Sequence, residues 1–167
     1  MAAGATYEPI ATTTLGSAAS SITFSSIPAT YTDLRLVLVG TASTAAPDIQ
    51  VQFNSDTSTN YSRTRMAGTG STVFNGTTSN ASYIAADYTG LSTTIPSLYE
   101  FDIFSYAGST YKTMLTKVAE DRNGSGDVFL QVGMWRSTAA ITSIYLFLSA
   151  YNFAAGTTAT LYGIKAA

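Results

Sequence analysis

Apolar and polar residues alternate with a period of two along most of the chain. In Ile49–Asn54, for example, Ile49, Val51 and Phe53 alternate with two glutamines. Such alternation is typical of a β-strand with one buried face. It predicts strands at Asp33–Gly40, Ile49–Asn54, Tyr99–Phe104, Asp127–Trp135, Ile144–Leu148 and Thr160–Lys165.

Shorter segments rich in Thr, Val, Ile, Tyr and Phe predict further strands, because these residues suit a pleated, half-buried surface. The segments are Ile10–Leu15, Ser21–Phe24, Tyr61–Met66, Ser82–Tyr88 and Tyr111–Ala119. No segment carries a helix-period apolar stripe between capping signals, so no helix is predicted. Gly, Ser, Thr and Asn occur throughout Gly68–Ala81, which is the longest predicted loop.

About ten short strands separated by turn signals predict an all-β fold, an antiparallel β-sandwich of jelly-roll type. The 167 residues fit one domain, which we place at residues 9–167. Residues 1–8 are predicted to be an N-terminal contact arm. The segment Met1–Tyr7 is small, apolar and uncharged, and Tyr7 is expected to anchor it against another subunit.

Composition excludes several kinds of chemistry. The chain has no His and no Cys, which excludes Cys/His zinc sites, disulfides and Ser-His or Cys-His catalysis. Only 11% of the residues are charged, and the eight Lys and Arg are scattered, so nucleic acid is not an expected partner. The longest apolar run, Ile144–Leu148, is too short for a membrane helix, and no secretory signal is visible. No metal or other cofactor is predicted.

Glu100 and Asp102 share one face of a predicted strand, and paired carboxylates can perform general acid–base catalysis. The opposite face of that strand is apolar, so ordinary solvated alternation explains the pair equally well. Because no other carboxylate pair is nearby in the sequence, the chain is predicted not to be an enzyme.

The segment Asp121–Asp127 resembles the first half of a calcium-binding loop, with oxygen-bearing side chains at alternate positions and a glycine at the sixth. Val132 occupies the twelfth position, where a bidentate Glu is required. A glycine-rich hairpin loop without metal is therefore the prediction.

Two sets of residues could form contacts. Tyr83, Tyr88, Tyr106 and Tyr111 could line a glycan-binding face, although tyrosines also fill sandwich cores and edges. Arg63 and Arg65 lie on one face of a short predicted strand, and the arginine fork often pairs with carboxylates at interfaces. We predict a subunit contact at Tyr7, Arg63 and Arg65, with an ordinary surface charge pair as the alternative for the arginines.

Stretches of the sequence together resemble small β-modules of tailed-bacteriophage virion structural proteins. The resemblance lies in Ile27-Pro28 followed by Tyr31 and Asp33-Leu34, in Phe53-Asn54 followed by Asp56 and Asn60-Tyr61, in Gly133–Ile144, and in the closing Leu161–Lys165. It extends from about Tyr7 to Ala167. Such modules occur at phage head surfaces and in tail-fibre or appendage proteins, and they imply no catalytic residues.

The resemblance implies a virion structural protein, located on the particle surface. Because this chain carries no fibre shaft or coiled-coil stem, we expect a capsid decoration (cement) protein that forms a homotrimer and contacts the major capsid protein. The alternative is a tail-fibre or appendage adhesin that binds a host surface glycan. A carbohydrate-active enzyme ranks third.

Overall fold

The computed structural model describes residues 6–44, 48–86 and 90–165. Within these ranges the chain forms twelve strands and no helix, and every strand pairing is antiparallel. The prediction of an antiparallel β-sandwich is confirmed. The described part of the chain also contains no helix long and apolar enough to cross a membrane.

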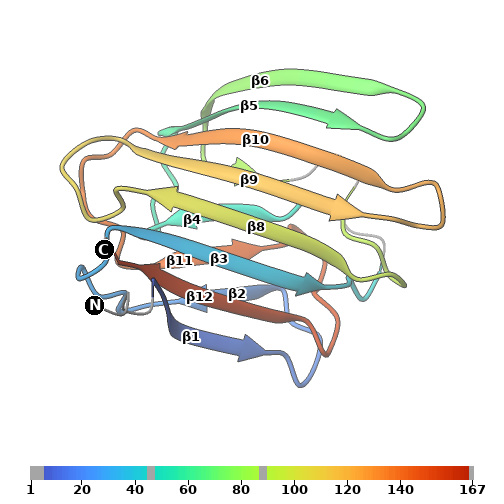
Figure 1. Cartoon of the computed structure of the whole chain (residues 1–167), viewed down its shortest axis with the longest axis horizontal. Helices are drawn as coiled ribbons and strands as arrows, with labels where there is room; N and C mark the ends of the chain where they lie inside the picture. The colour runs from blue at the N-terminus through green and yellow to red at the C-terminus, as the bar shows by residue number, and fades with distance from the viewer. Residues whose placement is uncertain (1–5, 45–47, 87–89, 166–167) are drawn as a thin grey trace.

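The strands form two sheets of unequal size (Figure 1). The larger sheet has eight strands in the order β1 (Tyr7–Thr14), β12 (Thr158–Ile164), β3 (Asp33–Gly40), β8 (Ser97–Phe104), β9 (Lys112–Glu120), β10 (Asp127–Trp135), β5 (Tyr61–Gly68) and β6 (Val73–Ala81). The smaller sheet has four strands in the order β2 (Ser21–Phe24), β11 (Ile144–Phe147), β4 (Gln50–Phe53) and β7 (Ile84–Ala85).

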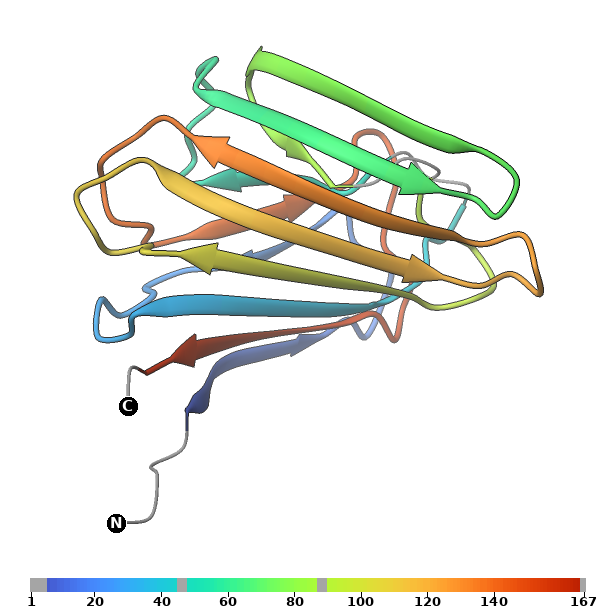
Figure 2. The ribbon, with the colours of Figure 1, turned by 45° about the horizontal axis from the view of Figure 1, so that its top comes forward.

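The hydrophobic core lies between the two sheets. Leu36 and Phe101, which pair across β3 and β8, belong to the same buried cluster as Val51 and Leu146 of the smaller sheet. The layers touch closely, since a Cβ atom added at Gly133 would lie 2.8 Å from Cδ1 of Ile84. We call the side of the larger sheet that meets the smaller sheet its inner face, and the opposite side its outer face. Figure 2 shows the larger sheet in front of the smaller one.

Three strands begin and end where the sequence predicts, namely β2, β3 and β10. Most other strands begin or end one to three residues away from the predicted position. The strand β7 spans only Ile84–Ala85 of the predicted Ser82–Tyr88. Tyr88 lies outside the described residues. The prediction of a loop over Gly68–Ala81 is wrong, because Val73–Ala81 forms β6 and pairs with β5. As an edge strand with much of its surface exposed, β6 has no apolar alternation to reveal it. The turn lies earlier, at residues 69–72, where Gly70 has a φ of 83°.

The boundary of the predicted contact arm is also corrected. Tyr7 and Glu8 belong to β1, where they pair with Ile164 and Gly163 of β12. Residues 1–5, the rest of the predicted arm, lie outside the described residues.

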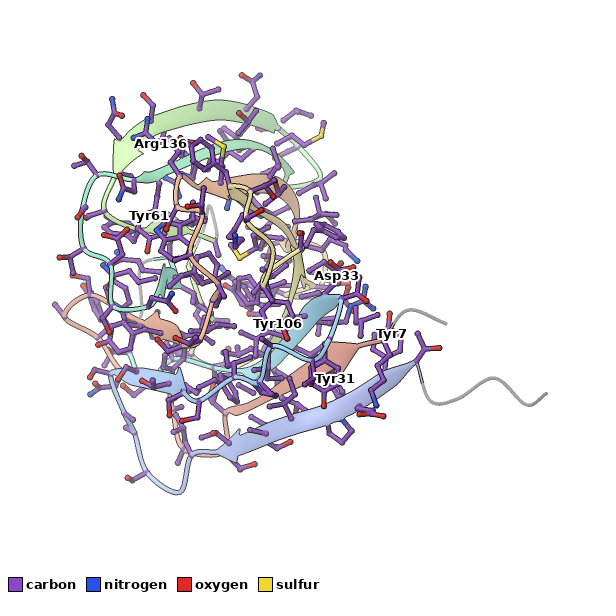
Figure 3. The ribbon with its side chains drawn as sticks, turned by 90° about the vertical axis from the view of Figure 1, so that its left-hand side faces the viewer. Tyr7, Tyr31, Asp33, Tyr61, Tyr106 and Arg136 are labelled. Atoms are coloured by element: carbon purple, nitrogen blue, oxygen red, sulfur yellow. The ribbon has the colours of Figure 1, made fainter. Side chains whose placement is uncertain are left out.

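Residues of the virion-module resemblance close one end of the sandwich (Figure 3). Tyr31 packs its ring onto Gly163, where an added Cβ would lie 2.3 Å from the ring. The Tyr31 hydroxyl donates to the Glu8 carboxylate at 3.3 Å, and its backbone N–H donates to the Tyr106 hydroxyl at 3.3 Å. Tyr106 is fully buried and donates in turn to the carbonyl of Pro28. These contacts explain why a tyrosine and a glycine occupy these positions.

Asp56 organises a second closure, between β4 and β5. Its carboxylate accepts hydrogen bonds from Nε1 of Trp135 at 2.7 Å, Nδ2 of Asn60 at 3.0 Å and the backbone N–H of Ser58 at 2.9 Å. Burial raises the pKa of this carboxyl, but the hydrogen bonds from Asn60, Trp135 and Ser58 outweigh burial and lower its pKa to about 2. The buried Tyr61 hydroxyl donates to the Asp56 carbonyl at 3.1 Å.

Replacing Gly163 by Ala should destabilise the protein by about 1–3 kcal/mol, because the added methyl group collides with the ring of Tyr31. Gly68→Ala is the matched control in another strand, since an added Cβ there meets nothing within 4 Å. Urea denaturation followed by circular dichroism measures both free energies of unfolding. Equal stability of the two variants would contradict the packing of Tyr31 on Gly163.

The depressed pKa of Asp56 predicts a loss of stability in acid. Because the folded-state pKa of about 2 lies below the ordinary 3.8, the stabilisation is complete above about pH 4 and declines as the pH falls toward 2. We expect the decline to amount to about 1–2 kcal/mol after allowance for solvent screening. Asp56→Asn should be less stable at pH 6 and lose less stability between pH 5 and pH 2.5. Parallel pH profiles for the two proteins would refute this role of the carboxylate.

Candidate functional site

The outer face of the larger sheet carries exposed apolar side chains. In β10 the outward positions are Val128, Leu130 and Val132, which are 69%, 42% and 44% exposed. The strand register places them beside apolar neighbours. Leu130 pairs with Met66 of β5. Val128 pairs with Ala119 of β9, which pairs in turn with Leu98 of β8. The exposed large apolar residues on this face are Val39, Met66, Val73, Leu98, Phe104, Val128, Leu130 and Val132. Soluble monomers seldom leave such a continuous apolar surface in water.

The strand β10 has apolar side chains on both faces and polar ones on its buried face. Asp127 and Gln131 point to the buried inner face, while the valines and Leu130 point to the outer face. The side-chain amide of Gln131 and the hydroxyl of its cross-strand neighbour Thr116 are buried without a hydrogen-bond partner. Apolar residues on both faces are typical of strands that are covered on both sides of their sheet.

Shallow hollows follow one another across the outer face. One, of about 400 Å³, is lined by Leu98, Glu100, Lys117, Val128 and Leu130, among others. Adjacent hollows of about 320 and 230 Å³ extend it toward Val39 and toward Met66, and another of about 400 Å³ lies over β5 and β6. All of them are open to solvent, so the surface suits contact with an extended partner.

Charged residues occupy the part of the outer face over β3, β8 and β9. Asp102, only 6% exposed, lies 2.5 Å from Nε of Arg35 and 3.3 Å from Nζ of Lys117. Lys117 also contacts Glu100 at 3.0 Å. The hydrogen bond to Asp102 raises the pKa of Arg35, and the hydrogen bond to Glu100 raises the pKa of Lys117. The four charges neutralise one another within the face.

The arrangement gives Glu100 and Asp102 a structural role. A general acid or base must reach a substrate, but here both carboxylates are held by cations. Tyr7 adjoins this network: its ring makes an edge contact with Tyr162 at 6.5 Å, and the Arg35 guanidinium lies 5.4 Å from its centroid. At 47% exposure, Tyr7 is the one predicted contact residue that the structure places on the outer face.

Arg63 and Arg65 lie elsewhere than expected. Register places both on the inner face of β5, in the rows of buried Gly133 and Gln131. Arg63 donates to the carbonyl of Ala85 at 2.6 Å and lies 4.0 Å from the Asp48 carboxylate. The predicted surface pair is therefore corrected to a pair of half-buried side chains that face the interior.

The tyrosines proposed for glycan binding do not form one face. Tyr106 is buried, Tyr111 is exposed at the start of β9, and Tyr88 lies outside the described residues. Tyr83 instead joins two aromatic residues that the sequence analysis did not select: it contacts Phe147 edge-on at 6.0 Å, and Phe147 stacks on Tyr145 at 4.9 Å. Tyr145 and Phe147 lie on the side of β11 away from the core, beside Gln52 and Gln50. Their alternation with buried Ile144 and Leu146 was the available signal.

The loop Asp121–Asp127 is a hairpin connection between β9 and β10. The Asp121 carboxylate accepts the backbone N–H of Gly124 at 2.8 Å, whereas Asp127 is buried on the inner face. Across residues 6–44, 48–86 and 90–165, no three His, Cys, Asp or Glu side chains gather in a way that could hold a metal ion.

Comparison with known proteins finds only distant structural similarity. No family model and no curated protein matches the sequence. Among solved structures, the chain is similar to the galectin LEC-6 of Caenorhabditis elegans, with 12% identity, a TM-score of 0.37 and coverage of 90% of this chain and 94% of that one. A protein of unknown function from Shewanella oneidensis MR-1 has 10% identity and a TM-score of 0.28, with 98% of this chain and 77% of that one covered.

Gln131→Met should stabilise the protein by about 1 kcal/mol or more, because it replaces a buried amide without a partner by an apolar side chain of similar size. Gln52→Met is the control: its amide donates to the Ser82 carbonyl at 2.9 Å, so its loss should cost about 1 kcal/mol. Thermal and urea denaturation of both variants check the opposite signs. A destabilised Gln131→Met protein would show that the amide is satisfied.

Proposed function

We propose that this protein is a bacteriophage virion structural protein, a capsid decoration protein that attaches to the head through its outer face. The observation that carries the proposal is the exposed apolar side of β10, which puts Val128, Leu130 and Val132 on the free side of the sheet. Covering them would remove apolar surface from water, which is the main favourable contribution to a lasting protein–protein contact.

Two further features support attachment rather than catalysis. The carboxylates of the outer face are neutralised by Arg35 and Lys117, so this face presents little net charge to a partner. The hollows on it are shallow and adjoin one another. A large, flat and mostly apolar partner such as a capsid subunit fits this surface better than a small substrate does.

The resemblance to virion modules supplies the type of particle. The motif residues Tyr31, Asp56 and Gly163 hold the fold together, so the resemblance concerns the module and leaves its location open. The exposed apolar side of β10 favours the head surface, where a decoration protein lies on a preformed lattice.

A tail-fibre or appendage adhesin is the second candidate, favoured by the aromatic group Tyr83, Tyr145 and Phe147. Aromatic rings stack on the CH groups of sugars, and these rings lie on the side of the smaller sheet that faces away from the core. This surface lies on the smaller sheet, away from the outer face, so the two candidates can be tested separately.

Val132→Lys should weaken binding to particles that lack the protein by about tenfold or more, because it would bury an ammonium group in an apolar contact. Thr23→Lys places the same charge on the exposed side of β2 and should bind like the wild type. Occupancy is measured by co-sedimentation at low and moderate salt and should change little between them, since apolar contacts are not screened.

Equal binding by Val132→Lys and wild type would refute attachment through the outer face. Label confined to the tail in electron micrographs, together with loss of glycan binding in Tyr145→Ala, would establish the adhesin instead. The contact arm is tested in the same assay by removing residues 1–5, a deletion that leaves Tyr7 and the pairing of β1 in place.

A further inference from the structure

The two edges of the larger sheet differ in their protection against pairing with another chain. At one edge, β1 contains Pro9, which has no N–H to donate, and its pairing is irregular between Pro9 and Ala11. Glu8 at the same edge forms an ion pair with Lys165 at 2.6 Å. Proline, irregular pairing and charge are the usual means by which edge strands avoid further pairing.

The opposite edge, β6, has neither proline nor charge, and its pairing with β5 is irregular only at one end, between Thr78 and Ala81. Its nine residues, Val73–Ala81, include no charged residue and no proline. Among the described residues β6 pairs with β5 alone, and it lies at the rim of the sheet in Figures 1 and 2. The backbone N–H and C=O groups on its free side are therefore a template for an additional strand.

We propose that β6 pairs antiparallel with β6 of a second copy of this chain, about a twofold axis at Gly76. The regular part of the β5–β6 pairing runs from Val73 to Thr78, and Gly76 lies near its middle. Antiparallel pairing about this point makes the contact self-complementary, as a twofold interface requires. It sets Asn75 of each copy opposite Thr77 of the other, and both are exposed.

The chemistry of these positions suits a second copy. Every β6 side chain brought together is uncharged. The same sheet already contains hydroxyl pairs of this kind, because Thr12 bonds Thr160 and Thr14 bonds Thr158 across β1 and β12, each at 3.1 Å. Gly76 itself adds no side chain at the axis, and Arg65 of β5 lies over it on the inner face, with its Nε 3.6 Å from the position of a Cβ added at Gly76. The result is a dimer whose two larger sheets form one continuous sheet.

This contact uses the backbone groups at the edge of β6, whereas attachment uses the side chains of β10 on the outer face. The two adjoin each other at the hollow that Thr77 and Val132 both line. A single strand pair is a small interface, so we expect a weak dimer. Its dissociation constant should lie between low micromolar and near-millimolar protein concentration. Sedimentation equilibrium over that range measures the mass and the dissociation constant. A wild-type protein that remains monomeric throughout would refute the proposal without bearing on particle binding.

Two substitutions test the edge. Thr77→Lys and Asn75→Asp should each raise the dimer dissociation constant by about tenfold, because each brings two like charges close to the axis. Thr12→Lys on the opposite edge is the matched control and should leave the constant unchanged. All three positions are exposed, and circular dichroism verifies that the variants are folded.

Mixing tests the register. In a mixture of the Thr77→Lys and Asn75→Asp proteins, the new lysine lies directly opposite the new aspartate, so a heterodimer should form more tightly than either homodimer. Failure of the mixture to associate would overturn the axis at Gly76. Equal weakening by Thr12→Lys, or a trimer that persists in Thr77→Lys, would overturn the pairing of β6.

Discussion

The structure depends on one constraint: a sheet of eight strands is packed against a sheet of only four. Each strand of the larger sheet has two faces, and the smaller sheet covers only one of them. The inner face therefore holds the large buried side chains, such as Phe101, Tyr99 and Phe129. The outer face receives whatever alternates with them, and in β10 these residues are apolar.

The charged part of the outer face shows how the chain stabilises an uncovered surface. The Asp102 carboxylate is nearly buried, yet Arg35 and Lys117 from the neighbouring strands compensate its charge. The β10 part of the face meets this network at Lys117, the cross-strand neighbour of Leu130, whereas Val132 has Leu115 and Thr64 as its cross-strand neighbours. The charged half of the face is thus compensated within the chain, while covering the apolar half with apolar atoms would lower the free energy.

Much of the fold was predictable, because alternation over β3, β4 and β10 is local information. The faces of β10 were not predictable, since Phe129 and Trp135 alternate with Val128 and Leu130 and both sides read as apolar. Only tertiary packing decides which side is buried. The inward direction of Arg63 had the same cause, since its partners Ala85 and Asp48 come from distant segments. The strand β6 escaped prediction because both its faces are largely polar.

The motif residues on which the proposed virion-module resemblance rests serve the closure of the fold. Tyr31 needs Gly163, and Asp56 needs Trp135 and Asn60, so these residues are coupled by the closure of the sandwich. The surfaces proposed for attachment and pairing contain none of them. Strand pairing at the β6 edge would extend the sheet within its own plane, whereas attachment would cover the outer face from above that plane, so the proposed contacts would be compatible in one subunit. Each contact then raises the effective concentration for the other, and a weak edge contact becomes sufficient once the face is attached.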